Sequence, residues 1–411
     1  MMTRIILLCV IYFLSLENGF AETRIIGGNE APAGAWPATV ALLKADKVSD
    51  GNFKAQFCGG SLIAPGWVLT AAHCVDASRG APHRPEDLLV LEGTQNLDAG
   101  GTRRSVSRII RHFDFDADDL DSDLALLKLS EPVAVPSIIN ILASEAPLGS
   151  DPNYPNATVV GWGDTDKSSS GSDFPKLLRQ VNVPVIEQGT CRDAYNSSLL
   201  PSFLEIEITD NMLCAGFADG DKDSCSGDSG GPLMVLNPDN SGEHVQVGVV
   251  SFGKGCGAKD AYGVYTRLSW FATWINGFKD GAVSVDEVPR IINGDSQYDV
   301  SIFALPNKVI TQLEASNIDG NSLNWDIIGG NDSLAFRIND NGELKLVDPH
   351  LLSPGSSYEL TVRVTDNEDG MDLAKVKVDV EVTSSGSTGP WFLLTLISLI
   401  MLRRQYIQDA R

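Results

Sequence analysis

The chain has 411 residues, of which 43% are apolar, so two or three domains and a sizeable core are expected. It carries 54 acidic residues against 31 basic ones, which gives a formal net charge of −23 at pH 7. Nucleic-acid-binding proteins need a basic face, so this balance argues against a nucleic-acid partner. We attribute the acidity to solubility.

Residues 1–21 are predicted to be a secretory signal peptide. Arg4 precedes an apolar run from Ile5 to Leu16, and Gly19 and Ala21 provide small residues for cleavage. The run is short for a membrane span. The chain is therefore expected to be exported to a compartment where disulfides persist.

The cysteine count supports this interpretation. Of seven cysteines, Cys9 leaves with the signal peptide, and the other six form an even set with many connectivities open. Since no odd thiol is left, we expect neither a cysteine nucleophile nor a cysteine-rich metal site. No metal and no cofactor are predicted.

Four short motifs follow in chain order. Ile25-Ile26-Gly27-Gly28 comes directly after the basic Arg24, and Thr70-Ala71-Ala72-His73-Cys74 ends a short apolar strand. Asp123-Leu124-Ala125-Leu126 places a carboxylate at the start of an apolar strand. Gly227-Asp228-Ser229-Gly230 puts a hydroxyl on a tight loop, where backbone N–H groups can converge on an oxyanion.

From about Ile25 to about Phe278 the sequence resembles trypsin-like serine proteases of the chymotrypsin fold. The resemblance implies that His73 is the general base, that Asp123 orients it, and that Ser229 is the nucleophile. The order His, Asp, Ser agrees with this fold rather than with subtilisins or α/β-hydrolases.

The resemblance also implies a fold and an oxyanion site. Residues 25–280 should form an all-β, two-barrel protease domain, with Leu268, Phe271, Ile275 and Phe278 on a closing helix. The amides of Gly227 and Ser229 would form the oxyanion hole. The implied disulfides are Cys58–Cys74, Cys191–Cys214 and Cys225–Cys256.

Activation by cleavage is a further implication of the resemblance. Residues 22–24 would be an activation peptide, cut after Arg24 by an activating protease. The new α-ammonium of Ile25 would then pair with Asp228. A buried carboxylate is costly without a counter-charge, so the oxyanion loop is expected to stay disordered before cleavage.

The resemblance places a specificity pocket around Asp223, at the pocket floor. Gly253 and Gly263 match wall positions that lack side chains, so the slot would admit an Arg or Lys side chain of a protein or peptide substrate. Ser224 can hydrogen-bond a lysine ammonium. Ser251-Phe252-Gly253 resembles the segment that pairs with the substrate backbone, although the family usually has tryptophan where Phe252 stands.

Beyond the protease, residues 281–297 lack strong periodicity and predict a linker. Within 298–384, apolar and polar residues alternate from Tyr358 to Val364 and from Ala374 to Val382. With a turn signal at Asn341-Gly342, this pattern predicts a small antiparallel β-sandwich. The region resembles a cadherin-like or immunoglobulin-like repeat.

The turn at Asp366-Asn367-Glu368-Asp369-Gly370 joins the last two predicted strands. Cadherin repeats often bind calcium between neighbouring domains, and these acids are oxygen ligands by type. With a single repeat we interpret them as solvated turn residues. Adhesion, spacing from a surface and assistance to export all remain open as roles of this domain.

The last segment, 385–411, is a Gly/Ser linker followed by a hydrophobic stretch, 391–402, and a basic tail that starts at Arg403-Arg404. It resembles the GlyGly-CTERM tail of exported Gram-negative proteins, although it lacks a Gly-Gly pair and extends further. The resemblance implies type II secretion and a rhombosortase-like processing partner. A glycosylphosphatidylinositol signal and an uncleaved tail anchor are the alternatives.

The leading hypothesis is a serine endopeptidase, secreted or held at the cell surface, that cleaves after Arg or Lys. The alternative is a catalytically idle binding protein in which the sandwich is the working part. Such a protein normally has a substituted triad or a broken oxyanion glycine, and this sequence has neither.

Overall fold

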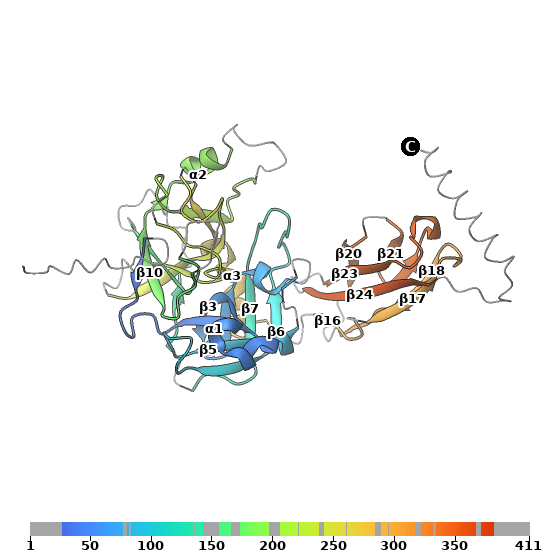
Figure 1. The fold of residues 1–411 in the computed structure, drawn as a ribbon, viewed down its shortest axis with the longest axis horizontal. Helices are drawn as coiled ribbons and strands as arrows, with labels where there is room; N and C mark the ends of the chain where they lie inside the picture. Colours follow the sequence, from blue (N-terminus) through green and yellow to red (C-terminus); the bar gives the residue numbers. More distant parts are fainter. Residues whose placement is uncertain are drawn as a thin grey trace, which may run out of the picture.

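A computed structural model gives the fold (Figure 1). It describes residues 27–76, 80–81, 84–134, 137–142, 156–165, 173–196, 206–220, 222–237, 242–259, 261–283, 289–294, 296–316, 322–331, 334–366 and 371–381. The predicted signal peptide, the Arg24–Ile25 junction and the hydrophobic tail lie outside these residues. Within the described ranges, no helix combines the length and apolar character needed to cross a membrane.

The first half of the protease region is a closed barrel with strand order β2-β3-β4-β7-β6-β5. Its strands are β2 (Thr39–Lys44), β3 (Gln56–Ala64), β4 (Trp67–Thr70), β5 (Leu88–Glu92), β6 (Thr102–Arg111) and β7 (Ala125–Leu129). Short helices connect them: η1 (Ala45–Asp50), α1 (Asn52–Ala55), η2 (Ala72–Val75) and η4 (Pro85–Asp87). The inward side chains of β4 and β7 are fully or almost fully buried, because both strands cross the barrel core.

The second half is a nine-stranded sheet with the order β1-β10-β9-β13-β14-β15-β12-β11, in which β8 pairs with β14. Its strands are β1 (Asn29–Glu30), β8 (Asn140–Ile141), β9 (Ala157–Gly161), β10 (Arg179–Val183), β11 (Val185–Ile186), β12 (Met212–Ala215), β13 (Pro232–Leu236), β14 (His244–Phe252) and β15 (Gly263–Arg267). Helix α2 (Gln188–Tyr195) lies beside β12. The predicted all-β protease fold with two barrel-like sheets is confirmed.

The closing helix α3 (Leu268–Lys279) follows β15 directly. The four apolar residues that predicted it, Leu268, Phe271, Ile275 and Phe278, are all buried. They pack into the core of the first barrel, where Phe278 meets Trp67 at a ring-centroid distance of 6.1 Å. The helix therefore joins the second sheet to the first barrel.

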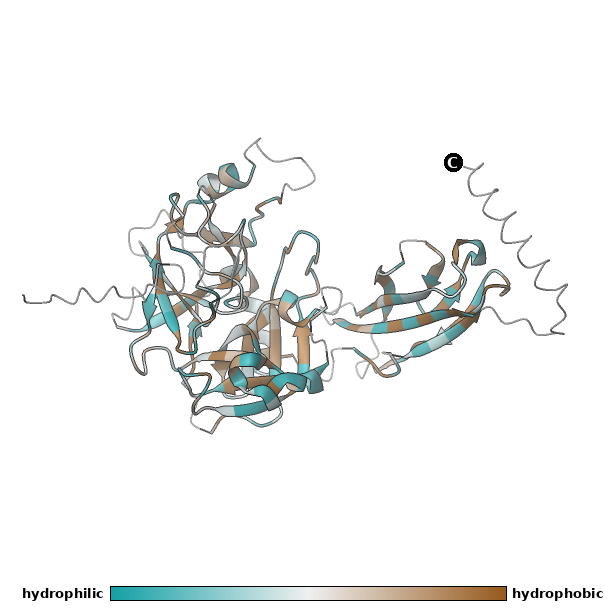
Figure 2. Cartoon of the chain, in the orientation of Figure 1, coloured by the Kyte–Doolittle hydropathy of each residue, from teal (hydrophilic) through white to brown (hydrophobic). Residues whose placement is uncertain are grey.

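The C-terminal region forms further β-sheets around a separate apolar core. Its elements are β16 (Arg290–Ile291), β17 (Gln297–Ser301), β18 (Lys308–Gln312), β19 (Ala315–Ser316), β20 (Asn324–Gly329), β21 (Phe336–Ile338), β22 (Glu343–Leu346), η6 (Pro349–Leu351), β23 (Ser357–Thr365) and β24 (Met371–Glu381). One sheet has the order β17-β24-β23-β20 and another β18-β22-β21. Apolar and polar residues alternate along these strands as brown and teal bands (Figure 2).

Two features of this region differ from the sequence prediction. β17 pairs with β24 in parallel, so the larger sheet is mixed rather than purely antiparallel. β16 lies inside the stretch predicted as a linker and pairs with β19. The Asn341-Gly342 turn is confirmed, since Gly342 has φ of +78° between β21 and β22.

We expect Ile275→Ala to lower the free energy of unfolding by about 2–5 kcal/mol, because it leaves a cavity in the barrel core. The matched control is Thr273→Ala, an exposed position on the same helix, with an expected change below about 0.5 kcal/mol. Urea unfolding followed by tryptophan fluorescence measures both. Equal effects would contradict the packing of α3 into the barrel.

Candidate active site

His73 is held at the end of a buried strand by covalent and polar contacts. It lies in η2, directly after β4, and its neighbour Cys74 is joined by a disulfide to Cys58 in β3. Thr70 donates a hydrogen bond from Oγ1 to the Gly59 carbonyl at 2.8 Å, which fixes the end of β4 against β3. The histidine backbone is therefore anchored on both sides.

Asp123 is completely buried at the start of β7 and faces His73. Its Oδ2 lies 2.7 Å from His73 Nδ1, and its Oδ1 accepts the His73 backbone N–H at 2.8 Å. Burial alone would raise the pKa of Asp123. The charge of His73 and the hydrogen bonds from His73 and Ser251 outweigh burial and leave the pKa below its ordinary value. An ionised carboxylate at Nδ1 favours the tautomer whose Nε2 can accept a proton.

The second sheet also binds Asp123. Ser251 in β14 donates a hydrogen bond from Oγ to Asp123 Oδ2 at 2.5 Å. Thr266 in β15 donates from Oγ1 to the Asp123 carbonyl at 2.7 Å. The sequence singled out Ser251 only for substrate binding, and Thr266 was missed because a threonine inside a strand carries no motif.

Ser229 lies in the loop before β13, packed against the strands that lead to His73. Its carbonyl accepts a hydrogen bond from Gly59 N–H at 2.7 Å, and the next N–H, of Gly230, donates to the Val250 carbonyl at 2.8 Å. Gly230 has φ of +79°, and a Cβ there would lie 2.2 Å from Thr70 Oγ1. Only glycine allows this approach, so the loop bearing Ser229 abuts the segment that bears His73.

The loop of Gly227 and Asp228 is fixed by hydrogen bonds. Gly227 has φ of +96°, and its carbonyl accepts a hydrogen bond from Gln56 Nε2 at 2.9 Å. The Asp228 carboxylate accepts from Gly163 N–H at 2.7 Å and from Cys225 N–H at 2.9 Å. Gln56 was missed at the sequence level because it belongs to no motif.

The buried environment of Asp228 disfavours the ionised form of its carboxyl group. It is completely buried, and burial raises its pKa to about 7, to which nearby Asp223 and Asp164 contribute. The two backbone hydrogen bonds pull the pKa down but do not offset burial. Ile25, the counter-charge expected from the sequence, lies outside the described residues.

Asp223 lies buried near the loop that follows β14. Its Oδ2 accepts a hydrogen bond from Gly257 N–H at 2.9 Å. A Cβ at Gly263 would lie 3.0 Å from Asp223 Oδ1, so a side chain at this position would crowd the carboxylate. At Gly253 a Cβ would meet its nearest neighbour, Gly255 O, at an ordinary 3.6 Å, so the protein itself leaves room there. Ser224 Oγ is 3.4 Å from the Tyr265 hydroxyl.

All three disulfides that the resemblance implied are present: Cys58–Cys74, Cys191–Cys214 and Cys225–Cys256. The last joins the segment of Asp223 to the loop that holds Gly257 near its carboxylate. Among the described residues, the group with metal-ligand spacing is Cys58, His73 and Cys74. Since both cysteines are oxidised, their sulfurs are not thiolate ligands.

Comparison with known proteins shows the family of this chain. The family model described as Trypsin matches residues 25–275. The chain belongs to the trypsin family. It is a serine endopeptidase, a hydrolase of peptide bonds.

Three known proteins are each similar to between 62% and 67% of this chain. The trypsin of Xenopus laevis is 35% identical over 272 residues, which are 66% of this chain and 97% of the frog protein. The tryptase of Mus musculus is 36% identical over 283 residues, 67% of this chain and 98% of the mouse protein. The proclotting enzyme of Tachypleus tridentatus is 36% identical over 261 residues, 62% of this chain and 65% of that protein.

The raised pKa of Asp228 predicts a pH dependence of stability in the chain whose Arg24–Ile25 bond is intact. Between the ordinary value near 4 and about 7, the folded chain holds a proton that the unfolded chain has lost. Raising the pH across this range therefore destabilises the folded state, by about 4 kcal/mol if Asp228 acts alone.

The control is Asp228→Asn, which removes the titrating group and keeps the shape. We expect the free energy of unfolding of the wild-type chain to fall relative to that of the variant as pH rises from about 4 to 7. Denaturant unfolding across this range measures the difference. Parallel pH profiles for the two chains would show that Asp228 does not titrate there.

Proposed function

We propose that this serine endopeptidase cleaves after Arg or Lys through a triad of His73, Asp123 and Ser229. The observation that carries the proposal is the buried Asp123 carboxylate, which binds both Nδ1 and the backbone N–H of His73. This arrangement leaves Nε2 as the base. The Ser229 loop packs against Thr70 and Gly59, next to the segment that bears His73. This packing supports Ser229 as the residue that His73 deprotonates.

In the proposed mechanism, His73 takes the hydroxyl proton of Ser229 as Oγ attacks the scissile carbonyl. The N–H groups of Gly227 and Ser229 stabilise the oxyanion, and the imidazolium, held by Asp123, gives its proton to the leaving amine. An acyl-enzyme remains. Water, deprotonated by His73, then releases the acyl group and restores Ser229.

Specificity is proposed to come from Asp223. Asp223 is 5% exposed, and a buried carboxylate attracts a cation strongly, while the lack of a side chain at Gly263 avoids crowding its Oδ1. An extended Arg or Lys side chain could pair with it, with Ser224 as a further acceptor. Ser251, Phe252 and Gly253, at the end of β14, would pair with the substrate backbone as an added strand.

Activation is proposed to require cleavage between Arg24 and Ile25 by another protease. The pKa of about 7 supports this proposal, because a buried carboxylate that resists ionisation gains from an ammonium partner. Pairing Ile25 with Asp228 would further fix the loop of Gly227, whose carbonyl already accepts a hydrogen bond from Gln56.

We propose that the mature enzyme works outside the cytosol, secreted or at a cell surface. Its three disulfides support an oxidising compartment. The β-sheets of the C-terminal region fit a cadherin-like or immunoglobulin-like module. The segment 391–402 is proposed to be a transient anchor that a rhombosortase-like enzyme removes.

Ser229→Ala tests the nucleophile. With a chromogenic peptide that ends in Arg, we expect kcat to fall by several orders of magnitude, because no other hydroxyl replaces the attacking group. Ser130→Ala, which removes an exposed hydroxyl at the end of β7, is the control and should leave kcat unchanged. Equal rates for wild type and Ser229→Ala would exclude catalysis through this serine.

Asp223→Ser tests specificity. We expect kcat/KM for Arg- and Lys-ending peptides to fall at least about a hundredfold, because the cation loses a desolvated partner. Asp219→Ser, at an exposed acid of the preceding loop, should leave kcat/KM within about twofold. A wild-type preference for a Phe-ending peptide would contradict the assignment.

A further inference from the structure

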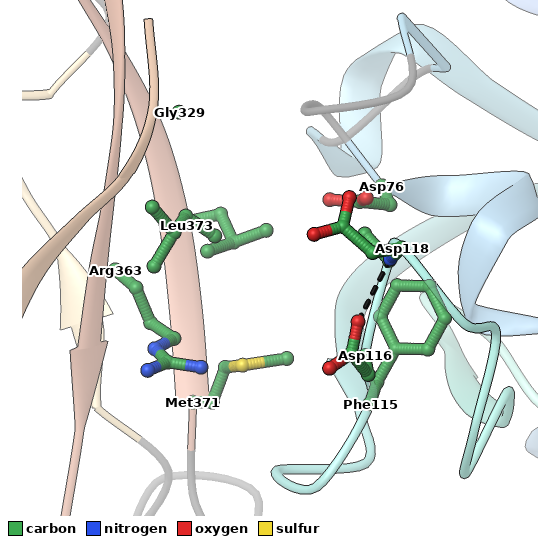
Figure 3. A pocket seen from close by; sticks show the side chains of 10 residues that line it. Asp76, Phe115, Asp116, Asp118, Gly329, Arg363, Met371 and Leu373 are labelled. Atoms are coloured by element: carbon green, nitrogen blue, oxygen red, sulfur yellow. Dashed lines mark hydrogen bonds between the residues drawn. The ribbon is translucent and has the colours of Figure 1, made fainter. Parts of the chain in front are cut away.

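Strand β24 of the C-terminal region contacts β6 of the first barrel, and residues 372–374 of β24 line a cavity together with Arg108 and Ile109 of β6. Two cavities flank this contact. One, of about 600 Å³, is lined by Asp76, Phe115 and Asp118 of the protease and by Arg363, Met371 and Leu373 of the C-terminal sheet (Figure 3). The other, of about 250 Å³, has Arg108 on one side and Asp372 on the other.

Arg111, the last residue of β6, is completely buried at this contact. It attracts two carboxylates, Asp372 of β24 and Asp76 of the protease. Burial lowers the pKa of the guanidinium, and these two acids act against that effect. A buried cation of this kind depends on its counter-charges.

Arg111 also connects the two segments that carry the site. Its Nε donates a hydrogen bond to the Val75 carbonyl at 2.8 Å, at the end of the η2 helix that contains His73. In the sheet, Arg111 pairs with Ala125, two residues after Asp123. The position of this one guanidinium therefore bears on both members of the His73–Asp123 pair.

Asp372 is fixed within its own domain. Its Oδ2 accepts the Ile291 N–H of β16 at 2.9 Å, and the residue is partly buried between Met371 and Leu373. Burial raises the pKa of Asp372 above its ordinary value, and Arg111, the N–H groups of Ile291 and Leu373, and Arg108 offset this rise only in part. The aspartate thus presents a carboxylate to the barrel from a fixed place in β24.

We propose that Asp372 is a positioning residue for His73 and acts through Arg111 and the Val75 carbonyl. Asp372 neutralises the buried guanidinium and so holds Arg111 where its Nε binds Val75. Without this carboxylate, the buried guanidinium loses the larger of its two counter-charges and shifts from its place, so η2 loses the hydrogen bond that fixes its end. The C-terminal domain is then part of the catalytic unit. This inference rests on the proposed role of His73.

The test uses the chain that has been cleaved between Arg24 and Ile25 and retains its C-terminal domain. Activity is measured with a small Arg-ending substrate, and active sites are counted with a serine-directed covalent inhibitor. Asp372→Asn should lower kcat per active site about tenfold, since small displacements of a catalytic group are costly. KM should stay unchanged, because the partners of Asp372 are Ile291, Leu373, Arg111 and Arg108 and include no residue of the proposed specificity pocket. Asp379→Asn, on the same strand but paired with Lys377, is the control and should not change kcat.

A double-mutant cycle tests the route through Arg111. In an Arg111→Met background, Asp372→Asn should have no further effect on kcat. An equal loss in both backgrounds, an unchanged kcat in Asp372→Asn, or an equal loss in Asp379→Asn would overturn the proposal.

Amide hydrogen exchange tests the positioning role of Asp372 independently of the proposed function. In the full chain carrying Ser229→Ala, Asp372→Asn should speed exchange over Ala72–Asp76, whereas Asp379→Asn should not. If the wild-type chain cleaved no peptide, the proposed function would fail and the exchange data would still test the contact. Unchanged exchange over Ala72–Asp76 would overturn the positioning role.

Discussion

The rest of the structure depends on one buried carboxylate, that of Asp123. An ion taken out of water needs close partners, and this one takes them from both halves of the protease. His73 binds it from the first barrel, and Ser251 and Thr266 bind Asp123 from the second sheet. Neither half alone could keep the carboxylate ionised and oriented, so the site exists only where the two halves meet.

The same interdependence extends to the loop of Ser229. This loop belongs to the second sheet but rests on Gly59 and Thr70 of the first barrel. The disulfide between Cys58 and Cys74 fixes the same corner, next to His73. Covalent, polar and steric constraints thus converge on one place, and this convergence lets distant parts of the sequence share one geometry.

Much of the protease fold and of the candidate site could be predicted from the sequence, because several positions allow few residue types. Gly230 must be glycine, since Thr70 Oγ1 lies 2.2 Å from where its Cβ would be, and glycine is favoured at Gly263, where a Cβ would crowd the Asp223 carboxylate. Alternating apolar residues predicted β23 and β24 correctly. An alternating pattern does not indicate the direction of a strand, however, so it could not predict that β17 pairs with β24 in parallel. Gln56, Arg111 and Asp372 were missed because their partners are far away in the chain.

The place of β24 in its sheet has a consequence for biosynthesis. This strand is the last of the described elements to leave the ribosome, yet it lies between β17 and β23. The first strand of the sheet, β17, therefore stays without its neighbour until the other strands of the sheet have been made. Since β24 also contacts β6, the protease domain gains this support only once the C-terminal sheet has been synthesised.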